Sequence, residues 1–178
     1  MATTKWALDP THSEVGFKVK HLMFTNVSGS FNIFTVHTET DNENFDNAII
    51  DFTADTDSVS TNSEQRDEHL KSADFFDAVS FPKIIFKATK YVNIDNDGSY
   101  ELTGDLTLHG VTKSITISVE FGGVIKDPWG NIKAGFTING KINRKDFGLN
   151  WNAVLETGGV MVSEEVRINA EIQLIKQP

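Results

Sequence analysis

Apolar and polar residues alternate along much of the chain. The two most regular runs cover residues 114–121 and 166–174, where every second residue is apolar and most of the residues between are polar. A period of two places the apolar side chains on one face of a β-strand. Shorter runs of the same kind occur at residues 15–19, 31–33, 50–54, 84–88, 102–108 and 136–142. The pattern predicts about eight strands, each with one buried face.

Short turn sequences separate several of these runs. Asp97-Gly98, His109-Gly110 and Pro128-Trp129-Gly130-Asn131 each stand between two strand-like segments. Gly, Pro, Asn and Asp are the residues that tight turns select. Connections this short join neighbouring antiparallel strands. Gly122-Gly123 and Gly158-Gly159 read as further turns.

One segment, at about residues 62–76, predicts a helix. The preceding Thr61 and the acidic Glu64 match a capping box, in which the hydroxyl caps a backbone N–H and the acid reaches back. The segment ends before Phe81-Pro82, which cannot continue a helix.

These elements predict an all-β fold with one inserted helix, in a single domain of residues 1–178. A sandwich and a closed barrel both hide the edges of antiparallel sheets. We favour an antiparallel eight-stranded barrel, because its interior is wide enough for side chains or for one slender ligand.

The interior is expected to be rich in phenylalanine, since the chain has 13 Phe but only three Trp and two Tyr. Phe needs no hydrogen-bond partner when buried. Small residues such as Gly104 and Gly140 at inward positions either let opposite side chains interdigitate or leave a channel. From the pattern alone, a core filled by side chains is the favoured interpretation and a ligand channel the alternative.

Composition and charge narrow the possible partners. Sixteen Lys and Arg against 25 Asp and Glu give a net charge of −9, which disfavours nucleic acid and anionic membrane surfaces. The absence of Cys excludes disulfides and thiolate chemistry. No apolar run approaches a membrane span, and the first residues lack a signal-like apolar region. We therefore expect no stable membrane insertion and a cytoplasmic location, or a periplasmic one if a signal segment has been removed.

Several segments, in order, resemble the YceI-like family, also called polyisoprenoid-binding proteins. The first is Asp9-Pro10-Thr11-His12-Ser13, followed by Val15-Gly16-Phe17 and Gly29-Ser30-Phe31. The later ones are residues 66–77 (RDEHLKSADFFD), Phe81-Pro82 with Phe86, residues 104–113 (GDLTLHGVTK) and residues 142–149 (INRKDFGL).

The resemblance implies an extended, lipocalin-like barrel whose apolar channel holds a long lipid. Its ligand would be an isoprenoid such as a polyprenyl phosphate or quinone, or a fatty-acid-like chain. The resemblance also implies a non-catalytic transport protein that forms a homodimer, with no cofactor beyond the bound isoprenoid lipid or quinone. It reverses the preference for a filled core.

Strand parity and the resemblance together select candidate ligand-binding residues. We expect the lipid tail to contact inward-facing strand residues and three aromatic residues outside the strands: Phe17, Val19, Phe31, Phe52, Phe75, Phe76, Phe86, Leu106, Leu108, Ile117, Val119, Phe136, Ile138 and Trp151. A register error of one residue would move a whole strand's set to the outer face.

Charged and imidazole side chains within the family-like segments are candidates for polar head-group contacts: His21, Arg66, His69, His109 and Arg144. For the two arginines, a structural ion pair with a neighbouring acid is the default interpretation. For the histidines, the default is a hydrogen bond that holds a turn or a strand end.

Two other functional classes remain as alternatives. The histidines are far apart and form no metal-binding spacing, so we predict no metal site. An enzyme with a His and a carboxylate inside the barrel requires such a pair within hydrogen-bond reach. A ligand-free interaction module would instead present a strand edge to a partner.

Overall fold

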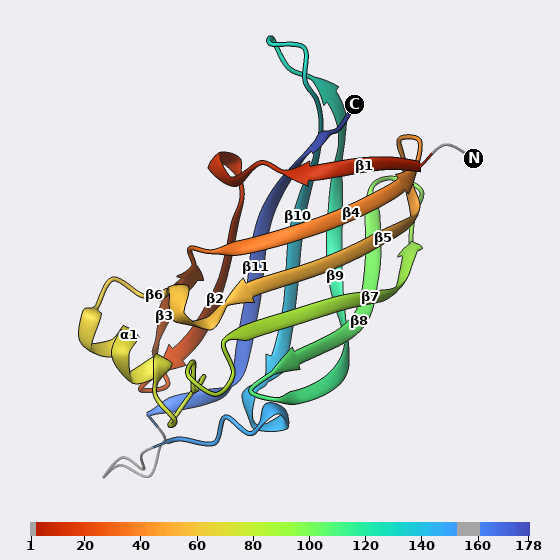
Figure 1. Cartoon of the computed structure of the whole chain (residues 1–178). Helices are drawn as coiled ribbons and strands as arrows, with labels where there is room; N and C mark the ends of the chain where they lie inside the picture. Colours follow the sequence, from red (N-terminus) through yellow and green to blue (C-terminus); the bar gives the residue numbers. More distant parts are fainter. Residues whose placement is uncertain (1–2, 153–160) are drawn as a thin grey trace.

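The computed structural model describes residues 3–152 and 161–178 and consists mainly of strands, with one short helix outside the barrel at one end (Figure 1). The strands are β1 (Thr3–Leu8), β2 (Glu14–His21), β3 (Thr25–Phe31), β4 (Phe34–Asp41), β5 (Asn44–Asp55), β6 (Val59–Ser60), β7 (Lys83–Asn93), β8 (Ser99–Leu108), β9 (Val111–Lys126), β10 (Ile132–Asn143) and β11 (Val162–Lys176). The helix is α1 (Glu64–Lys71), and short 3-10 helices cover Pro10–His12, Thr56–Ser58 and Arg144–Phe147.

The strands close into an antiparallel barrel. Neighbours follow the order β1-β4-β5-β7-β8-β9-β10-β11, and β11 pairs again with β1, for example at Leu8↔Leu174. β2, β3 and β6 continue the sheet from β11, and β3 and β6 lie at the end of the barrel that carries α1 (Figure 1). The structure confirms the predicted all-β, eight-stranded, lipocalin-like barrel with one helix.

The first long strand is interrupted where Pro10 enters the chain. β1 pairs with the last residues of β11, and β2 pairs with Val162–Glu171 of the same strand. Between them, Asp9 caps the 3-10 helix by accepting a hydrogen bond from Thr11 N at 3.2 Å. Proline lacks an N–H for the ladder, so a break at this point costs the sheet little.

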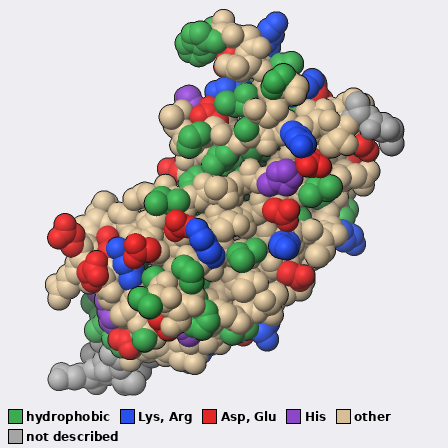
Figure 2. Space-filling view, viewed as in Figure 1, with side chains coloured by type: hydrophobic (Ala, Val, Ile, Leu, Met, Phe, Trp, Pro, Cys, Tyr) green, Lys and Arg blue, Asp and Glu red, His purple; other side chains and the backbone are tan. Residues whose placement is uncertain are grey.

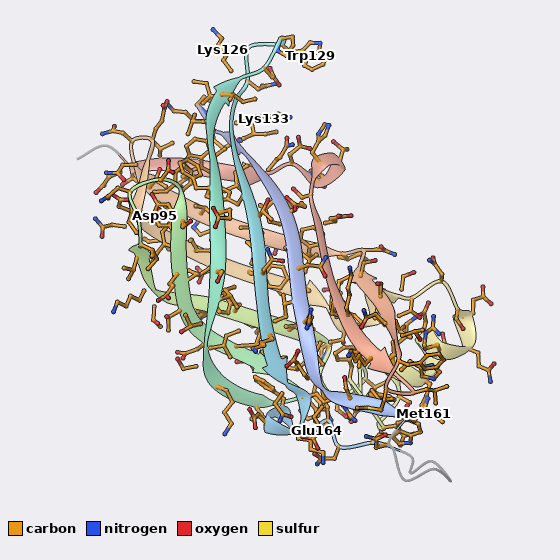
Figure 3. All side chains as sticks on the ribbon, turned by 180° about the vertical axis from the view of Figure 1, so that it is seen from behind. Asp95, Lys126, Trp129, Lys133, Met161 and Glu164 are labelled. Carbon is orange, nitrogen blue, oxygen red and sulfur yellow. The ribbon has the colours of Figure 1, made fainter. Side chains whose placement is uncertain are left out.

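The predicted turns at Asp97-Gly98, His109-Gly110 and residues 128–131 are all found between strands. His109 and Gly110 form the two-residue connection from β8 to β9, with φ angles of 54° and 73°. Positive φ angles at both central residues are typical of a type I′ turn, whose twist matches that of the two flanking strands. The hairpin between β9 and β10 extends beyond the barrel and carries Trp129 at its tip (Figure 3).

The prediction of a turn at Gly122-Gly123 is wrong. Both glycines lie inside β9, where the register with β10 shifts at a β-bulge next to the pair Phe121↔Phe136. Gly123 has a φ of 107°, which L side chains avoid, so glycine suits the bulge. The second predicted turn, Gly158-Gly159, lies outside the described residues.

The helix is shorter than the predicted segment of residues 62–76. Asn62 has a left-handed φ of 64°, so the helix begins only after it. Ser63, rather than Thr61, is the N-cap and accepts a hydrogen bond from Arg66 N at 3.3 Å. The chain leaves the helix at Ser72 and continues in turns that carry Phe75 and Phe76.

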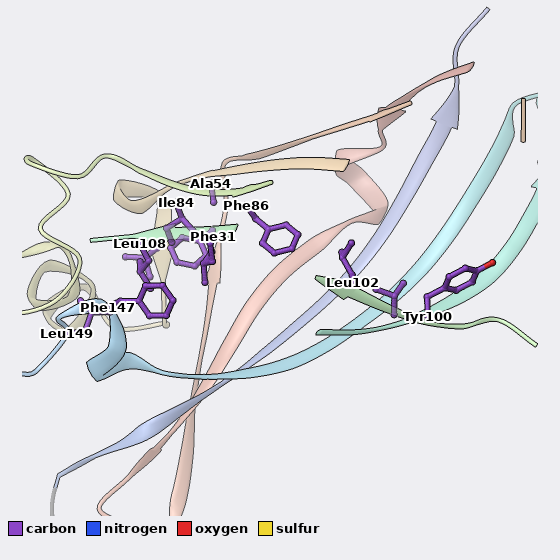
Figure 4. Close-up of a cluster of buried hydrophobic side chains, with 12 residues drawn as sticks. Phe31, Ala54, Ile84, Phe86, Tyr100, Leu102, Leu108, Phe147 and Leu149 are labelled. Carbon is purple, nitrogen blue, oxygen red and sulfur yellow. The ribbon is translucent and has the colours of Figure 1, made fainter. Parts of the chain in front are cut away.

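Two clusters of buried side chains occupy the interior. The larger one includes Phe31, Ile84, Phe86, Leu108 and Phe147 and reaches along the barrel to Tyr100 (Figure 4). A smaller cluster surrounds Trp6 at the other end of the barrel and consists of Trp6, Phe45, Ala134, Ala170, Ile172 and Leu174. No helix in the described part of the chain has the length and apolar character that crossing a membrane requires.

Candidate functional site

The barrel encloses a cavity of about 380 Å³. It extends from the α1 end, where Phe75 and Trp151 line it, to Phe45 and Leu174 near the opposite end. Ligand pockets usually have volumes of roughly 300–1,000 Å³. The interior is therefore a cavity rather than a core filled by side chains, which pattern alone had favoured.

Every residue predicted to contact the lipid tail lines this cavity. These residues are Phe17, Val19, Phe31, Phe52, Phe75, Phe76, Phe86, Leu106, Leu108, Ile117, Val119, Phe136, Ile138 and Trp151. The strand parity therefore assigned the inward faces of the strands correctly, while contact with a lipid stays a prediction. Parity also extends the lining to residues that were not selected, such as Ile115, Ile168 and Ile172.

Glycines let the aromatic rings lie flat against neighbouring strands. A Cβ at Gly104 would meet Phe86 Cζ at 2.5 Å, and one at Gly29 would meet Phe17 Cζ at 2.4 Å. A Cβ at Gly140 would lie 2.4 Å from Ile117 Cγ2. The small residues therefore make room for interdigitating side chains, and the cavity lies among the side chains they accommodate.

Aromatic rings from the helix segment form one wall of the cavity. Phe76 packs edge-on against Phe17 and Phe31, with ring centroids 6.4 and 5.6 Å apart. Phe75 and His69 both contact Trp151, at 5.3 and 4.8 Å. Rings in these geometries attract one another through their quadrupoles, so the segment after α1 is held against the barrel by specific contacts.

Basic and imidazole groups on the lining gather at this same end. Lys20, His21, Arg66, His69 and Arg144 line the cavity there, whereas no Asp or Glu is among the described lining residues. By contrast, acidic and basic side chains are interspersed on the outer surface (Figure 2). Lys20 is an addition that sequence reasoning missed, because on an alternating strand it belongs to the outward parity.

Arg144 is only 3% exposed and is held by backbone carbonyls. Its guanidinium donates to Ser163 O at 2.9 Å, Leu149 O at 2.6 Å, Trp151 O at 2.8 Å and Val162 O at 3.3 Å. Burial lowers the pKa of Arg144. Its hydrogen bonds to the described residues go to backbone carbonyls, whereas the default interpretation expected an ion pair with a neighbouring acid.

Three of the other candidate head-group residues, Arg66, His69 and His109, have local partners. Arg66 donates to Thr61 Oγ1 at 2.8 Å and to Thr61 O at 2.6 Å. His69 Nε2 lies 2.9 Å from Asp74 Oδ2. His109 does not line the cavity: its Nδ1 lies 3.2 Å from Phe147 O, and its ring packs on Phe81. His109 thus holds a turn, as the default interpretation for a histidine expects.

The inner end of the cavity carries two hydroxyl groups, Thr38 and Tyr91. The Tyr91 hydroxyl is buried and has no hydrogen-bond partner among the described residues. Its ring stacks on Tyr100 with centroids 4.4 Å apart, and the Tyr100 hydroxyl donates to Asp46 Oδ1 at 3.0 Å. Burial raises the pKa of Tyr91.

Sequence reasoning missed Tyr91 because a bulge reverses the parity of β7. Ala88 pairs with Gly104, but Lys90 pairs with Thr103, so one residue is inserted between them. Ala88 and Tyr91 therefore both belong to the inner face although they are three residues apart. Nothing in the local sequence marks this bulge with a glycine.

Most side chains that line the cavity are apolar, which suits it to holding an apolar chain. The described residues contain no group of three or more His, Asp or Glu able to hold a metal ion. The pairs His12–Asp9 and His37–Glu39 have side chains outside the cavity lining, and Asp74, the partner of His69, is exposed.

Comparisons with known proteins agree with this geometry. The model of the YceI-like domain matches residues 6–174. A UPF0312 protein of Staphylococcus aureus (strain MSSA476) is 41% identical over 171 residues, which cover 96% of both chains. The crystal structure of the Campylobacter jejuni YCEI protein is 36% identical and aligns with a TM-score of 0.77 over 96% of each chain.

A more distant structure shares the fold alone. It is a polyisoprenoid binding domain from Saccharophagus degradans, 15% identical, with a TM-score of 0.68 over 97% of this chain and 98% of that one.

Proposed function

The chain belongs to the YceI-like domain family, and we propose that it binds one long-chain isoprenoid lipid in its barrel and catalyses no reaction. The observation that carries this proposal is the apolar cavity of about 380 Å³ inside the barrel. The polyisoprenoid binding domain that shares this fold supports the choice of an isoprenoid chain.

The size of the cavity makes an occupant energetically important. Side chains that line an unfilled apolar space lack van der Waals partners on one side, and this lowers stability. A lipid chain that fills the cavity restores the lost van der Waals contacts and is removed from water itself.

The distribution of charge on the cavity lining supports a head group at the α1 end. Lys20, His21, Arg66 and His69 line that end, and the buried Arg144 guanidinium lies behind them. An anionic group such as a phosphate or carboxylate would meet several donors there and no described carboxylate on the lining. The proposed ligand is accordingly a polyprenyl phosphate, with a quinone or a fatty-acid-like chain as related candidates.

Blocking the cavity tests the proposal. Ile138 lines the cavity, and its neighbour Asn139 is exposed on the outer face of β10. Ile138→Trp is expected to abolish the lipid recovered by extraction and mass spectrometry of the purified protein, while Asn139→Trp retains it. Wild-type protein that carries no lipid and binds no added polyprenyl phosphate would contradict the proposal.

The homodimer, the transport role, the cytoplasmic location and the absence of nucleic-acid binding stay predictions. We propose the homodimer on family resemblance, and light scattering of the purified protein measures its mass directly.

A further inference from the structure

The inner end of the cavity differs chemically from the rest of the lining. The side chains around Tyr91 there are almost all apolar and include Leu102, Val119 and Phe136. Lys, Arg and His residues on the described lining are all at the opposite, α1 end. The Tyr91 hydroxyl is therefore a polar group in a mainly apolar part of the lining.

The Tyr91 hydroxyl is buried and forms no hydrogen bond with the described residues, so its desolvation is uncompensated by them. An unmade hydrogen bond of this kind costs about 1–3 kcal/mol, which is why nearly all buried polar groups are paired. The neighbouring Tyr100 shows the usual solution, since its hydroxyl reaches Asp46 Oδ1 at 3.0 Å. Tyr91 stacks on that ring and is itself one of the residues that line the cavity.

Tyr91 is suited to donating a hydrogen bond. Burial, with smaller contributions from Tyr100 and Asp46, raises the pKa of Tyr91, so the hydroxyl keeps its proton across the physiological pH range. Thr38 is only 2% exposed and also lines the cavity, from β4, which is separated from β7 by β5 alone. Two hydroxyls therefore border the inner part of an otherwise apolar channel.

We propose that the Tyr91 hydroxyl forms a polar subsite at the inner end of the cavity, which donates a hydrogen bond to a neutral oxygen on the chain end that enters first. Hydroxyl, ketone and ester oxygens belong to this class. A charged oxygen does not, because the described lining at this end offers no cation and burial of an unpaired charge is very costly. The inference rests on the proposed lipid-binding function and adds a second point of recognition to it.

A matched pair of ligands isolates the subsite. Straight-chain fatty acids of 12 to 18 carbons and their ω-hydroxy counterparts differ only in a terminal hydroxyl, and an unbranched chain is thinner than an isoprenoid chain. Their affinities for delipidated protein are measured by displacement of a fluorescent fatty acid. The length series ensures that one member places its terminal oxygen beside Tyr91.

Tyr91→Phe is expected to weaken the best ω-hydroxy acid about 5- to 10-fold, the size of one neutral hydrogen bond, and not to weaken the plain acid of the same length. Tyr100→Phe is the matched control: it removes the same atom from the stacked ring, which does not line the cavity. It is expected to change both affinities by the same factor.

The outcomes separate the two proposals. If both ligand series bind the wild type and Tyr91→Phe affects them equally at every length, the polar subsite is refuted and the lipid-binding function stands. If neither series binds the wild type, the lipid-binding function itself fails, and the subsite with it.

Discussion

At the scale of single residues, Arg144 connects parts of the chain that no strand pairing joins. It fixes Leu149 and Trp151 against the first residues of β11 through four hydrogen bonds to carbonyl oxygens. A buried cation held only by dipoles needs all of these partners. The family-like segment suggested a functional arginine, but only the three-dimensional arrangement shows that most of its donors serve the backbone.

Arg144→Lys is expected to lower the free energy of unfolding by about 3 kcal/mol, because a lysine ammonium cannot reach several divergent carbonyls and stays buried. Urea denaturation at pH 7 measures the change. Lys145→Met is the control, since Lys145 is exposed and its Nζ lies 2.8 Å from Glu164 Oε1. The midpoint of unfolding of this variant should barely move. An Arg144→Lys protein as stable as the wild type would refute the structural role.

Removal of the Tyr91 hydroxyl and removal of the Tyr100 hydroxyl are expected to change stability in opposite directions. Tyr91→Phe removes a buried hydroxyl without a described partner, so the delipidated protein should be equally stable or more stable by about 1 kcal/mol. Tyr100→Phe breaks the bond to Asp46 and should lose about 1 kcal/mol. Thermal unfolding of the two variants side by side decides the matter, and a clear loss in Tyr91→Phe would show that its hydroxyl is satisfied.

At the scale of elements, alternation predicted the strands well because each has one face on the interior. It failed where the backbone departs from regularity. The bulges in β7 and β9 insert a residue each, and a left-handed Asn62 delays the helix. Such features depend on how two strands pair or on how a loop leads into a helix. The bulge in β7 lies at Thr89, between Ala88 and Lys90, and the sequence there contains no glycine that would predict it.

The break between β1 and β2 is held by a buried ion pair that predicts acid sensitivity. Lys133 Nζ lies 2.8 Å from Asp9 Oδ2, and this hydrogen bond, aided by those from His12 and Thr11, holds the pKa of Asp9 well below its usual range although burial opposes it. The unfolded chain, with an Asp pKa of about 3.9, binds the proton more readily. The stabilisation is therefore complete above about pH 5 and is lost as the pH falls below 4.

At pH 7 the free energy of unfolding of Asp9→Asn is expected to be about 2 kcal/mol lower than that of the wild type. The difference should become progressively smaller towards pH 3. Urea unfolding across this pH range tests the trend. Glu101→Gln, at an exposed position on β8, provides the comparison and should follow the wild type. A constant difference between Asp9→Asn and the wild type at all pH values would contradict the assignment.

At the scale of the whole molecule, the barrel was predictable but the cavity inside it was not. Period-two strands, short turns and a single helix indicate a closed antiparallel sheet, and the family resemblance adds its shape. Whether Phe17, Phe86 and Ile117 fill the interior or line a cavity depends on small differences in position among many side chains. Those differences are set by strand tilt and curvature, which no single segment encodes.

A cavity that could hold a ligand is expected to lower the stability of the protein when the ligand is removed. Ile138→Trp should raise the unfolding temperature of the delipidated protein, because the larger ring fills part of the space that a lipid would occupy. Asn139→Trp should leave that temperature unchanged. Calorimetry of delipidated proteins makes the comparison, and a destabilised Ile138→Trp would mean that the indole does not fit the cavity.

The closure of the barrel also has a consequence for how the protein is made. β1 meets β11 through only three residue pairs, Trp6↔Lys176, Ala7↔Ile175 and Leu8↔Leu174, which join the two ends of the chain. During synthesis, β1 cannot form its pairs with β11 until β11 has emerged from the ribosome. Contacts of such long range form late and slowly. The barrel therefore closes only after β11 has been synthesised, late in the synthesis of the domain.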